Sequence, residues 1–433
     1  MKRTDVIIIG GGAAGLMAAY GLVKAGKSIR VLEARNRLGG RIHTIKENGF
    51  SGHVELGAEF VHGKLPVTLN LLREAGIEVV EVGFEMWQYR ETAFKQNNEF
   101  IEGWNGLLEK LNSLEKDMTL HDFLEQHYSG KEREKQRAQI ENYVAGYDTA
   151  DALDASVFSL RREWNNEDED SQFRLKDGYQ TMVQYLADAC TGNNNEILLN
   201  TIAKEVLIED GRLKVITNDG IVYEAQQAIV ALPLGVLQSE EGEGSVKFNP
   251  QLYSHLKATQ NIGFGSVIKI LLEFDEMFWE DTALTSLNGS DLSGMGFLFA
   301  DTEISTFWTQ SPNRSTLLTG WIGGPPAYKI KDLPDQEIMK MAIASLSHVF
   351  KIAPEKLQNK LTAWNVANWT SESFTRGSYA YDKVKSPEAR KVLQEPFENT
   401  IYFAGEYLYD GPAMGTVEAA LTSGKQVAEM ILE

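Results

Sequence analysis

Cysteine is almost absent from this chain of 433 residues, because Cys190 is the only one. A single cysteine cannot form a disulfide framework or a cysteine-rich metal site within one chain. No other part of the sequence groups enough ligands for a metal, and no Ser-His-Asp or Cys-His arrangement stands out. We therefore expect neither a bound metal nor nucleophilic catalysis of the hydrolase type.

Positive charge is also scarce. The chain has 42 Lys and Arg against 61 Asp and Glu, which gives a formal net charge of −19. Nucleic-acid binding needs clustered Lys and Arg, so nucleic acid is not an expected partner. Acidity of this kind serves solubility first, and it would also concentrate a cationic ligand near the protein.

Only one long stretch lacks charge, at residues 6–23, and its 18 residues include five glycines. Its place after Lys2 and Arg3 is typical of a signal peptide or a membrane span. However, it divides into a strand-like run, a glycine turn and a helix-like run, which a signal segment does not do. With no apolar tail before Glu433, we expect a cytoplasmic protein without membrane contact.

The start of the chain predicts a β-α-β unit of about 30 residues. Residues 5–9 form a β-branched run that fits a buried parallel strand, and the glycine-rich residues 10–15 follow it. An Ala- and Leu-rich helix then continues to about Lys24, Gly26 ends it, and residues 28–33 predict the second strand.

Later segments follow a mixed pattern, with strong turn signals at Asp210-Gly211 and Asp219-Gly220. We expect mostly helix over residues 104–162, further helices over 179–189, 335–350 and 416–432, a strand meander over 197–237 and a strand over 401–404. No low-complexity linker separates these segments, so two domains would have to exchange chain rather than follow one another.

The segment GGGAAG at residues 10–15 satisfies the G-x-G-x-x-G pattern. Gly10 allows a tight turn, Gly12 lets the backbone approach a pyrophosphate, and Gly15 lets the helix pack on the strand. The helix N-terminus supplies N–H donors and a positive dipole to phosphates. Glu33, at the end of the second strand, is placed to accept hydrogen bonds from a ribose diol, so the sequence predicts dinucleotide binding.

A second glycine pair indicates which dinucleotide. The segment VLEARNRLGGRI, residues 31–42, places Gly40 and Arg41 where backbone and a guanidinium can reach the same pyrophosphate. A nicotinamide enzyme does not need this second clamp, whereas a permanently held flavin does. The segment resembles the signature of the FAD-dependent amine oxidase superfamily.

Further segments extend this resemblance over most of the chain outside residues 84–162. VELGAEFVHG (54–63) is similar to the flavin-flanking segment of polyamine oxidases, and GSVIK (265–269), with Phe278-Trp279 after it, to the lysine segment of monoamine oxidases. Similar matches are ALPLGVL (231–237), NW with RGSYAY (368–381), FAGE (403–406) and TVEAALTSG (416–424).

The resemblance implies an α/β fold in which a Rossmann-like FAD-binding domain is interleaved with a substrate domain of mixed sheet and helices. The expected FAD-binding domain comprises residues 1–80, 180–250 and 390–433. The expected substrate-binding domain comprises residues 81–179, which include the helical region, and residues 251–389.

The resemblance also assigns the positions that would hold FAD. They are Gly10, Gly12, Ala13, Ala14, Gly15, Glu33, Ala34, Arg35, Gly40, Arg41, Gly57, Ala58, Glu59, Phe60, Val206, Gly405, Glu406, Met414, Gly415, Thr416 and Val417. The backbone of Val206 would meet adenine and Glu406 the ribitol or phosphate region. Val417, at a helix start, would face the flavin pyrimidine, where the helix dipole stabilises negative charge on a reduced flavin.

Lys269 is the first expected catalytic residue. By alternation alone it would be an outward-facing strand lysine, since burying it in an apolar run is costly unless it is paired. The five-residue match implies instead that it holds a water at flavin N5 and favours the reaction of reduced flavin with oxygen.

Two aromatic residues are expected to line the substrate site. Tyr379 matches one wall of an aromatic cage that holds the amine by cation–π attraction, and Trp369 is a second candidate. The second cage tyrosine of monoamine oxidases falls opposite Pro412, so Tyr407 and Tyr409 are considered as replacements. Both aromatic assignments compete with ordinary packing on a strand.

Two other comparisons within the resemblance bear on cofactor and substrate. Monoamine oxidases attach FAD through a cysteine where this chain has Ser378, so non-covalent FAD is expected. His62 matches the histidine that polyamine oxidases place near the substrate, and the alternative is a core residue with its hydrogen bonds satisfied. The acidic residues 167–170 could attract distal ammonium groups or form a solvated loop.

The resemblance implies oxidative deamination of a primary or secondary amine, a monoamine or a polyamine. Hydride would pass to flavin N5 and O2 would be reduced to H2O2, so the partners are a small amine and O2; we also consider a homodimer. An L-amino acid oxidase would use Arg90 or Arg376 for a carboxylate. A flavin desaturase, or a non-catalytic flavin-holding interaction protein, is a further alternative.

Overall fold

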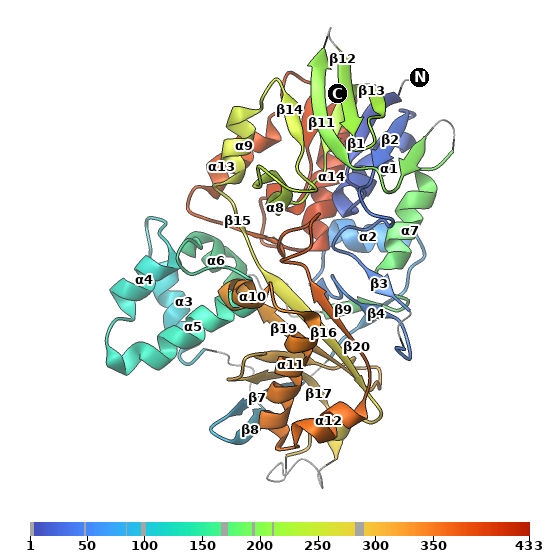
Figure 1. The fold of residues 1–433 in the computed structure, drawn as a ribbon. Helices are drawn as coiled ribbons and strands as arrows, with labels where there is room; N and C mark the ends of the chain where they lie inside the picture. Colours follow the sequence, from blue (N-terminus) through green and yellow to red (C-terminus); the bar gives the residue numbers. More distant parts are fainter. Residues whose placement is uncertain are drawn as a thin grey trace.

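Two large β-sheets organise the molecule, and the chain passes between them repeatedly (Figure 1). The computed structural model describes residues 4–46, 49–83, 85–96, 101–165, 172–192, 195–209, 212–281 and 290–433. The acidic residues 167–170 and the turn at Asp210-Gly211 lie outside these ranges.

The first sheet has eight strands in the order β10-β2-β1-β13-β12-β11-β14, with β22 also paired to β13. They are β1 (Thr4–Ile9), β2 (Ile29–Leu32), β10 (Glu196–Leu198), β11 (Ala203–Glu209), β12 (Arg212–Thr217), β13 (Val222–Val230), β14 (Lys247–Asn249) and β22 (Ile401–Phe403). Strands β10, β2, β1, β13 and β22 run parallel to one another. Their carboxyl ends therefore meet at one edge of the sheet.

Helices cover both faces of this sheet, which explains the continuous apolar run of β1. Val6 and Ile8 enter one core, whereas Ile7 and Ile9 enter the other. The first face is covered by α1 (Ala13–Lys24), α2 (Pro66–Glu74), α7 (Gln180–Ala189) and α14 (Val417–Leu432). The second face is covered by α8 (Leu234–Leu237), α9 (Tyr253–Thr259) and α13 (Ser386–Gln394).

The second sheet has seven strands in the order β20-β16-β19-β18-β17-β7-β8. They are β7 (Glu85–Arg90), β8 (Ala93–Gln96), β16 (Val267–Phe274), β17 (Met295–Ala300), β18 (Thr306–Trp308), β19 (Leu317–Gly323) and β20 (Leu361–Asn368). One face packs on α10 (Gly324–Ile330), α11 (Asp335–Phe350), α12 (Pro354–Lys360) and the 3₁₀ helix η3 (Phe278–Glu280). All of β16 is buried, so Lys269 does not face solvent as alternation alone suggested.

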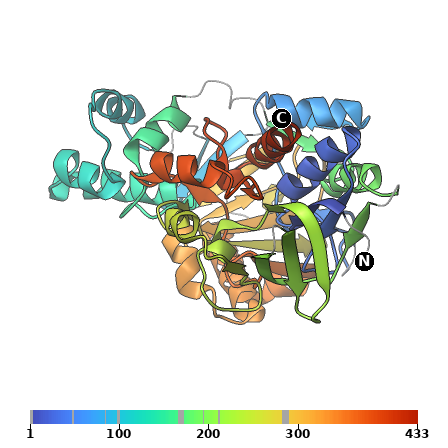
Figure 2. The ribbon, with the colours of Figure 1, turned by 90° about the horizontal axis from the view of Figure 1, so that it is seen from above.

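A separate helical region projects to one side in both ribbon views (Figures 1 and 2). It consists of α3 (Trp104–Asn112), α4 (Leu120–His127), the 3₁₀ helix η1 (Lys131–Arg133), α5 (Glu134–Gly146) and α6 (Val157–Trp164). These helices share their own apolar core. The prediction of mostly helix over residues 104–162 is therefore confirmed.

Three short sheets complete the framework around the centre of the molecule. They pair β3 (Thr44–Ile45) with β4 (Val54–Glu55), β15 (Gly263–Phe264) with β21 (Ala380–Tyr381), and β9 (Gln172–Leu175) with both β5 (Val61–His62) and β6 (Val79–Glu81). A 3₁₀ helix, η4 (Glu406–Leu408), follows β22. In the part of the chain that the structure describes, no helix is both long and apolar enough to cross a membrane.

The predicted α/β fold, with a Rossmann-like unit and a mixed sheet, is confirmed by this architecture and by the structural likenesses given below. The domain division stays a prediction. Helices α9 and α13 were assigned to residues 251–389 or to its boundary, yet they pack in the core of the first sheet. That packing favours grouping them with the FAD-binding part of the chain.

Helices α1 and α14 lie side by side across the first sheet, as both ribbon views show (Figures 1 and 2). The contact needs small residues: a Cβ on Gly424 would lie 2.2 Å from the backbone oxygen of Ala14. A Cβ on Gly106, in α3, would meet no atom within 4 Å.

We expect Gly424→Ala to lower the free energy of unfolding by about 1–3 kcal/mol, because α14 must move away from α1. Gly106→Ala is the matched control, since the same change in open space should stabilise the helix by up to about 1 kcal/mol. Denaturant unfolding measures both values. Equal effects of the two substitutions would contradict the packing argument.

Candidate cofactor and active site

A cavity of about 1410 Å³ is lined by residues from both large sheets and from α5 and α6. Pockets for single small ligands measure about 300–1,000 Å³. The volume therefore suits a large cofactor together with a second molecule. One end of the cavity lies at the carboxyl edge of the parallel strands, where open α/β sheets bind their ligands.

The glycine turn after β1 forms that end of the cavity. Gly10 has a positive φ of 110°, and a Cβ there would lie 2.5 Å from the Ala231 oxygen. A Cβ on Gly15 would lie 2.1 Å from the Gly10 oxygen, so Gly15 closes the turn against α1. By contrast, a Cβ on Gly12 would meet only Gly40, at 3.9 Å, which leaves the backbone open to the cavity. The first residues of α1 and α14 both line the cavity, so two helix N-termini direct their dipoles toward it.

Glu33 is buried at the end of β2 and binds the glycine turn itself. Its carboxylate accepts hydrogen bonds from the backbone N–H groups of Gly11, at 2.7 Å, and Arg35, at 2.9 Å. The Arg35 guanidinium is paired with Glu372 rather than directed at the cavity alone. Glu33 thus ties the glycine turn to the loop after β2.

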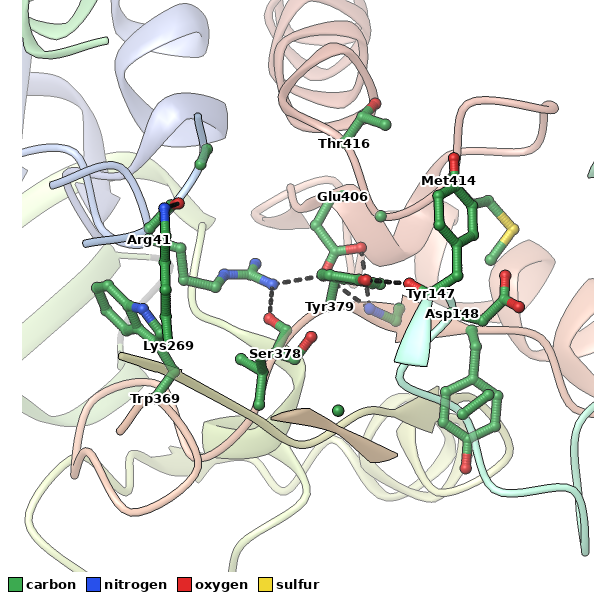
Figure 3. Close-up of a pocket in the computed structure, with 18 of the residues that line it drawn as sticks. Arg41, Tyr147, Asp148, Lys269, Trp369, Ser378, Tyr379, Glu406, Met414 and Thr416 are labelled. Carbon is green, nitrogen blue, oxygen red and sulfur yellow. Dashed lines mark hydrogen bonds and ion pairs between the residues drawn. The ribbon is translucent and has the colours of Figure 1, made fainter. Parts of the chain in front are cut away.

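Arg41 connects the loop after β2 with the C-terminal segments, as Figure 3 shows. Its guanidinium pairs with Glu406 at 2.9 Å and donates a hydrogen bond to the Ser378 backbone oxygen. Glu406 is buried and also accepts from the Ala380 N–H at 3.3 Å. Three segments that are distant in the sequence are therefore held around one charge pair.

Almost all residues that the sequence assigned to cofactor or substrate line this one cavity, including Lys269, His62, Tyr379 and Trp369. The exceptions are Gly15, which packs behind the turn, and Val206, which is fully buried in β11. Residues 201–203, just before β11 or at its start, border the cavity in place of Val206. Sequence alone located the segment but not the bordering residue, because strand facing depends on the sheet.

Lys269 is only 1% exposed and its ammonium is paired. Its Nζ donates to a Glu59 carboxylate oxygen at 2.7 Å and to the Gly57 backbone oxygen at 3.2 Å. It also lies 5.4 Å from the centre of the Trp308 ring. The free-energy cost of burying this ammonium is thus offset by an ion pair with Glu59, which the sequence alone did not reveal.

Glu59 binds protein groups on every side. It pairs with Arg174 at 3.0 Å and accepts hydrogen bonds from Trp308 Nε1 at 3.1 Å and Gln310 Nε2 at 3.3 Å. Burial raises the pKa of Glu59, but the charges of Lys269 and Arg174 outweigh burial and lower that pKa to about 2. The resemblance assigned Glu59 to the cofactor, whereas its carboxylate is committed to these four side chains.

Tyr379 forms part of the cavity wall (Figure 3), and its ring lies against Gly415, where a Cβ would be 2.7 Å away. Its hydroxyl donates to the Tyr147 backbone oxygen. Burial raises the pKa of Tyr379 well above its usual range, and the carboxylates of Asp148 and Glu163 add to this effect.

The proposed replacements for a second cage tyrosine do not line the cavity. Tyr407 is buried at 1% exposure in the core of the first sheet, and Tyr409 is also outside the lining. Other aromatic residues line it instead. Phe60 and Tyr381 belong to segments that the resemblance covers. Sequence reasoning missed a further group because its segments carry no motif: Tyr143, Tyr147, Phe297, Phe299, Trp308 and Trp321.

The remaining candidates occupy distinct places. His62 lines the cavity, and burial lowers its pKa while a hydrogen bond with Gln172 opposes that effect. Trp369 is buried and donates from Nε1 to the Leu56 oxygen at 2.8 Å, so it also serves as packing. Arg90 lines the cavity, whereas Arg376 binds Ser239 outside it.

The fold and this site define a protein with a dinucleotide-type cradle at the edge of a parallel sheet. A family model described as flavin containing amine oxidoreductase matches residues 13–432. The chain therefore belongs to the flavin-containing amine oxidoreductase family, and a flavin is its cofactor. The residues at the glycine turn, Arg41 and the two helix N-termini fit such a group.

Relatives within the family include both oxidases and demethylases. The chain is 27% identical over 454 residues to polyamine oxidase 4 of Oryza sativa subsp. japonica, covering 98% of this chain and 88% of that protein. It is 28% identical over 433 residues to lysine-specific histone demethylase 2 of Homo sapiens, covering 93% of this chain and 50% of that protein. The chain thus spans about half the length of the histone demethylases that it matches.

Solved structures share the fold at low sequence identity. A putrescine oxidase bound to putrescine has a TM-score of 0.80 at 21% identity, covering 100% of this chain and 99% of the other. Cyclohexylamine oxidase from Brevibacterium oxydans has a TM-score of 0.79 at 19% identity, with 99% of each chain covered.

One buried carboxyl near the site should titrate close to neutrality. Burial raises the pKa of Glu55 to about 7, although Tyr179 N–H and Thr44 donate hydrogen bonds to it. The native protein then holds a proton that the unfolded chain releases near pH 4.5. The contribution of Glu55 to the free energy of unfolding is therefore fully present below about pH 4.5 and is lost as pH rises toward 7.

We therefore expect the free energy of unfolding of Glu55→Gln to rise relative to that of the wild type between pH 5 and pH 8, by up to about 3 kcal/mol. Denaturant titrations of both proteins across this range measure the difference. A difference that does not change with pH would show that Glu55 is not protonated near neutrality.

Proposed function

We propose that this protein is an FAD-dependent amine oxidase that oxidatively deaminates a primary or secondary amine, a monoamine or a polyamine, and reduces O2 to H2O2. The observation that carries the proposal is Lys269. Its ammonium is buried on a central strand and reaches the same cavity as the G-x-G-x-x-G turn. Membership of the amine oxidoreductase family supports the same reaction class.

FAD, rather than a smaller flavin, agrees with the cavity volume of about 1410 Å³. The lining includes Gly12, Glu33, Arg41, Lys269 and Tyr379. Non-covalent binding is supported by Ser378, which stands where monoamine oxidases carry the linking cysteine. Cys190 is buried and does not line the cavity, so it offers no alternative thiol.

When bound, the flavin would accept a hydride from the carbon next to the amine nitrogen and pass the electrons to O2. The protein residues would position the amine and exclude water. The Tyr379 ring offers an aromatic wall for the amine, and its neutral hydroxyl stays bound to the Tyr147 oxygen. Lys269 would hold a water between its ammonium and the reacting centre.

Carboxylates on the cavity wall support a cationic substrate. Asp148, Glu163, Asp301 and Glu303 line the cavity together with Arg90 and Lys135, and Asp148 and Glu163 lie close enough to Tyr379 to affect its pKa. Carboxylates near Tyr379 would attract a cationic amine before it loses its proton for reaction. The relatives named polyamine oxidase and putrescine oxidase support amines of this kind.

A peroxide assay of the purified protein with putrescine, spermidine, tyramine and leucine tests the proposal. Peroxide with an amine, rising with pH as the free amine forms, is the expected result. Peroxide with leucine alone would favour an L-amino acid oxidase in which Arg90, on the cavity wall, binds the carboxylate. Bound flavin without peroxide from any amine would favour a non-catalytic interaction protein.

Lys269→Met should leave the protein yellow but slow the reoxidation of its reduced flavin by O2 by at least about tenfold, since the charge beside the reacting centre is lost. Stopped-flow absorbance measures the reoxidation rate after anaerobic reduction. Lys257→Met, on a surface helix outside the cavity, is the control. Wild-type reoxidation in Lys269→Met would overturn the assigned role.

A further inference from the structure

Three buried charges lie next to one another at the cavity wall, and they are not balanced. Lys269 and Arg174 are positive, and their side chains are 1% and 11% exposed. Glu59, at 5% exposed, is the carboxylate that both of them contact. A buried cation without a partner is strongly disfavoured, so two cations depend on one anion.

Within the part of the chain that the structure describes, no other anion contacts Lys269. On the neighbouring strands β19 and β20, the residues opposite Lys269 are Trp321 and Ala367, which carry no charge. Glu55 is close enough for its charge to interact with Lys269, but its carboxylate is bound to Thr44 and Tyr179. Among the described residues, Glu59 is thus the anion that contacts the ammonium.

The contacts of Glu59 also fix its position. Arg174 is held by the backbone oxygens of Thr309, at 2.9 Å, and Ser311. Trp308 and Gln310 donate to Glu59 from the same segment. The carboxylate is therefore anchored by residues of β9, β18 and the segment after β18, independently of Lys269.

An ammonium has three N–H donors. Glu59 and the Gly57 oxygen take two of them, and the third has no partner among the described residues. Because Lys269 lines the cavity, this third donor is available to a molecule inside it.

We propose that Glu59 is a positioning residue that keeps the Lys269 ammonium charged and aims its remaining N–H into the cavity. The idea that this N–H serves the oxygen reaction rests on the proposed function. The pairing itself does not, so it can be tested without turnover.

Chemical labelling of lysine provides such a test, because acylating reagents react only with the neutral amine. In Glu59→Gln, Lys269 keeps a hydrogen-bond acceptor but loses its counter-charge and remains beside Arg174. It should lose its proton at a lower pH, which raises the neutral fraction. Mass spectrometry of the full-length protein should therefore find Lys269 labelled at least about tenfold faster at pH 8 than in the wild type.

Three further variants separate charge from general loosening of the structure. Glu59→Asp keeps the charge and should return labelling toward the wild-type rate. Glu55→Gln removes a nearby buried carboxylate that interacts with Lys269 without contacting it, and should raise labelling much less than Glu59→Gln does. Glu59→Gln/Arg174→Met removes one of the two buried cations together with the carboxylate. It should therefore fold even if Glu59→Gln alone does not, and its Lys269 should still be labelled faster than in the wild type.

Oxidase activity is the second measurement. In Glu59→Gln, flavin reoxidation should fall as pH rises through the range in which Lys269 becomes labelled, whereas the wild type and Glu55→Gln should lack this fall. Wild-type labelling in both Glu59→Gln variants would overturn the proposal. Faster labelling with unchanged reoxidation would leave Glu59 as the partner of Lys269 but would overturn the role of the pair in the reaction with oxygen. A wild-type protein that forms no peroxide would overturn the proposed function alone.

Discussion

Parallel pairing in the first sheet is the constraint on which the site depends. Because β1, β2, β13 and β22 run in one direction, the loops that follow them must meet at one edge. The glycine turn and Glu33 come from one β-α-β unit, and the sheet brings them together there with Glu406 from near the end of the chain. Close contacts at Gly10 and Gly15 then hold the turn against the sheet, which leaves Gly12 facing the cavity.

Charge pairing is the second constraint, since the cavity wall contains many ionisable groups with little access to water. Arg41 pairs with Glu406, and Lys269 and Arg174 both pair with Glu59, at distances of 2.7–3.0 Å. Each pair joins segments that lie far apart in the sequence: 365 residues for the first and 210 for Lys269 and Glu59. Breaking one partner would leave the other charge buried alone, so these pairs bind the fold and the site together.

The helical region and the second sheet can accept more side-chain substitutions at the cavity wall than the glycine turn can. The glycine turn tolerates few side chains, because an added Cβ would lie too close to neighbouring backbone atoms. The wall contributed by α5, α6 and β17 to β19 is made of side chains, such as Tyr143, Phe297 and Trp321. Changes there would alter the shape of this part of the cavity and leave the glycine turn as it is, which would let related proteins share a cofactor and differ in what else they bind.

Local pattern determined the cofactor end of this protein. A strand, the GGGAAG turn, a helix and Glu33 are contiguous, and each obeys backbone rules that need no distant partner, so their arrangement could be predicted from the sequence. The lysine on β16 and the segment around Tyr379 were found only through resemblance to a family. Their positions in the cavity follow from strand order, which the local sequence does not encode.

Tertiary structure alone decided which groups surround those residues. Nothing near Glu59 in the sequence marks Arg174, 115 residues away, or Trp308, 249 residues away, as its partners. The same holds for Tyr407, whose sequence position suggested the cage but whose ring is buried in the sheet core. Local chemistry determines what a segment can bind, whereas the pairing of buried charges and the facing of side chains depend on contacts that exist only after the two sheets have come together.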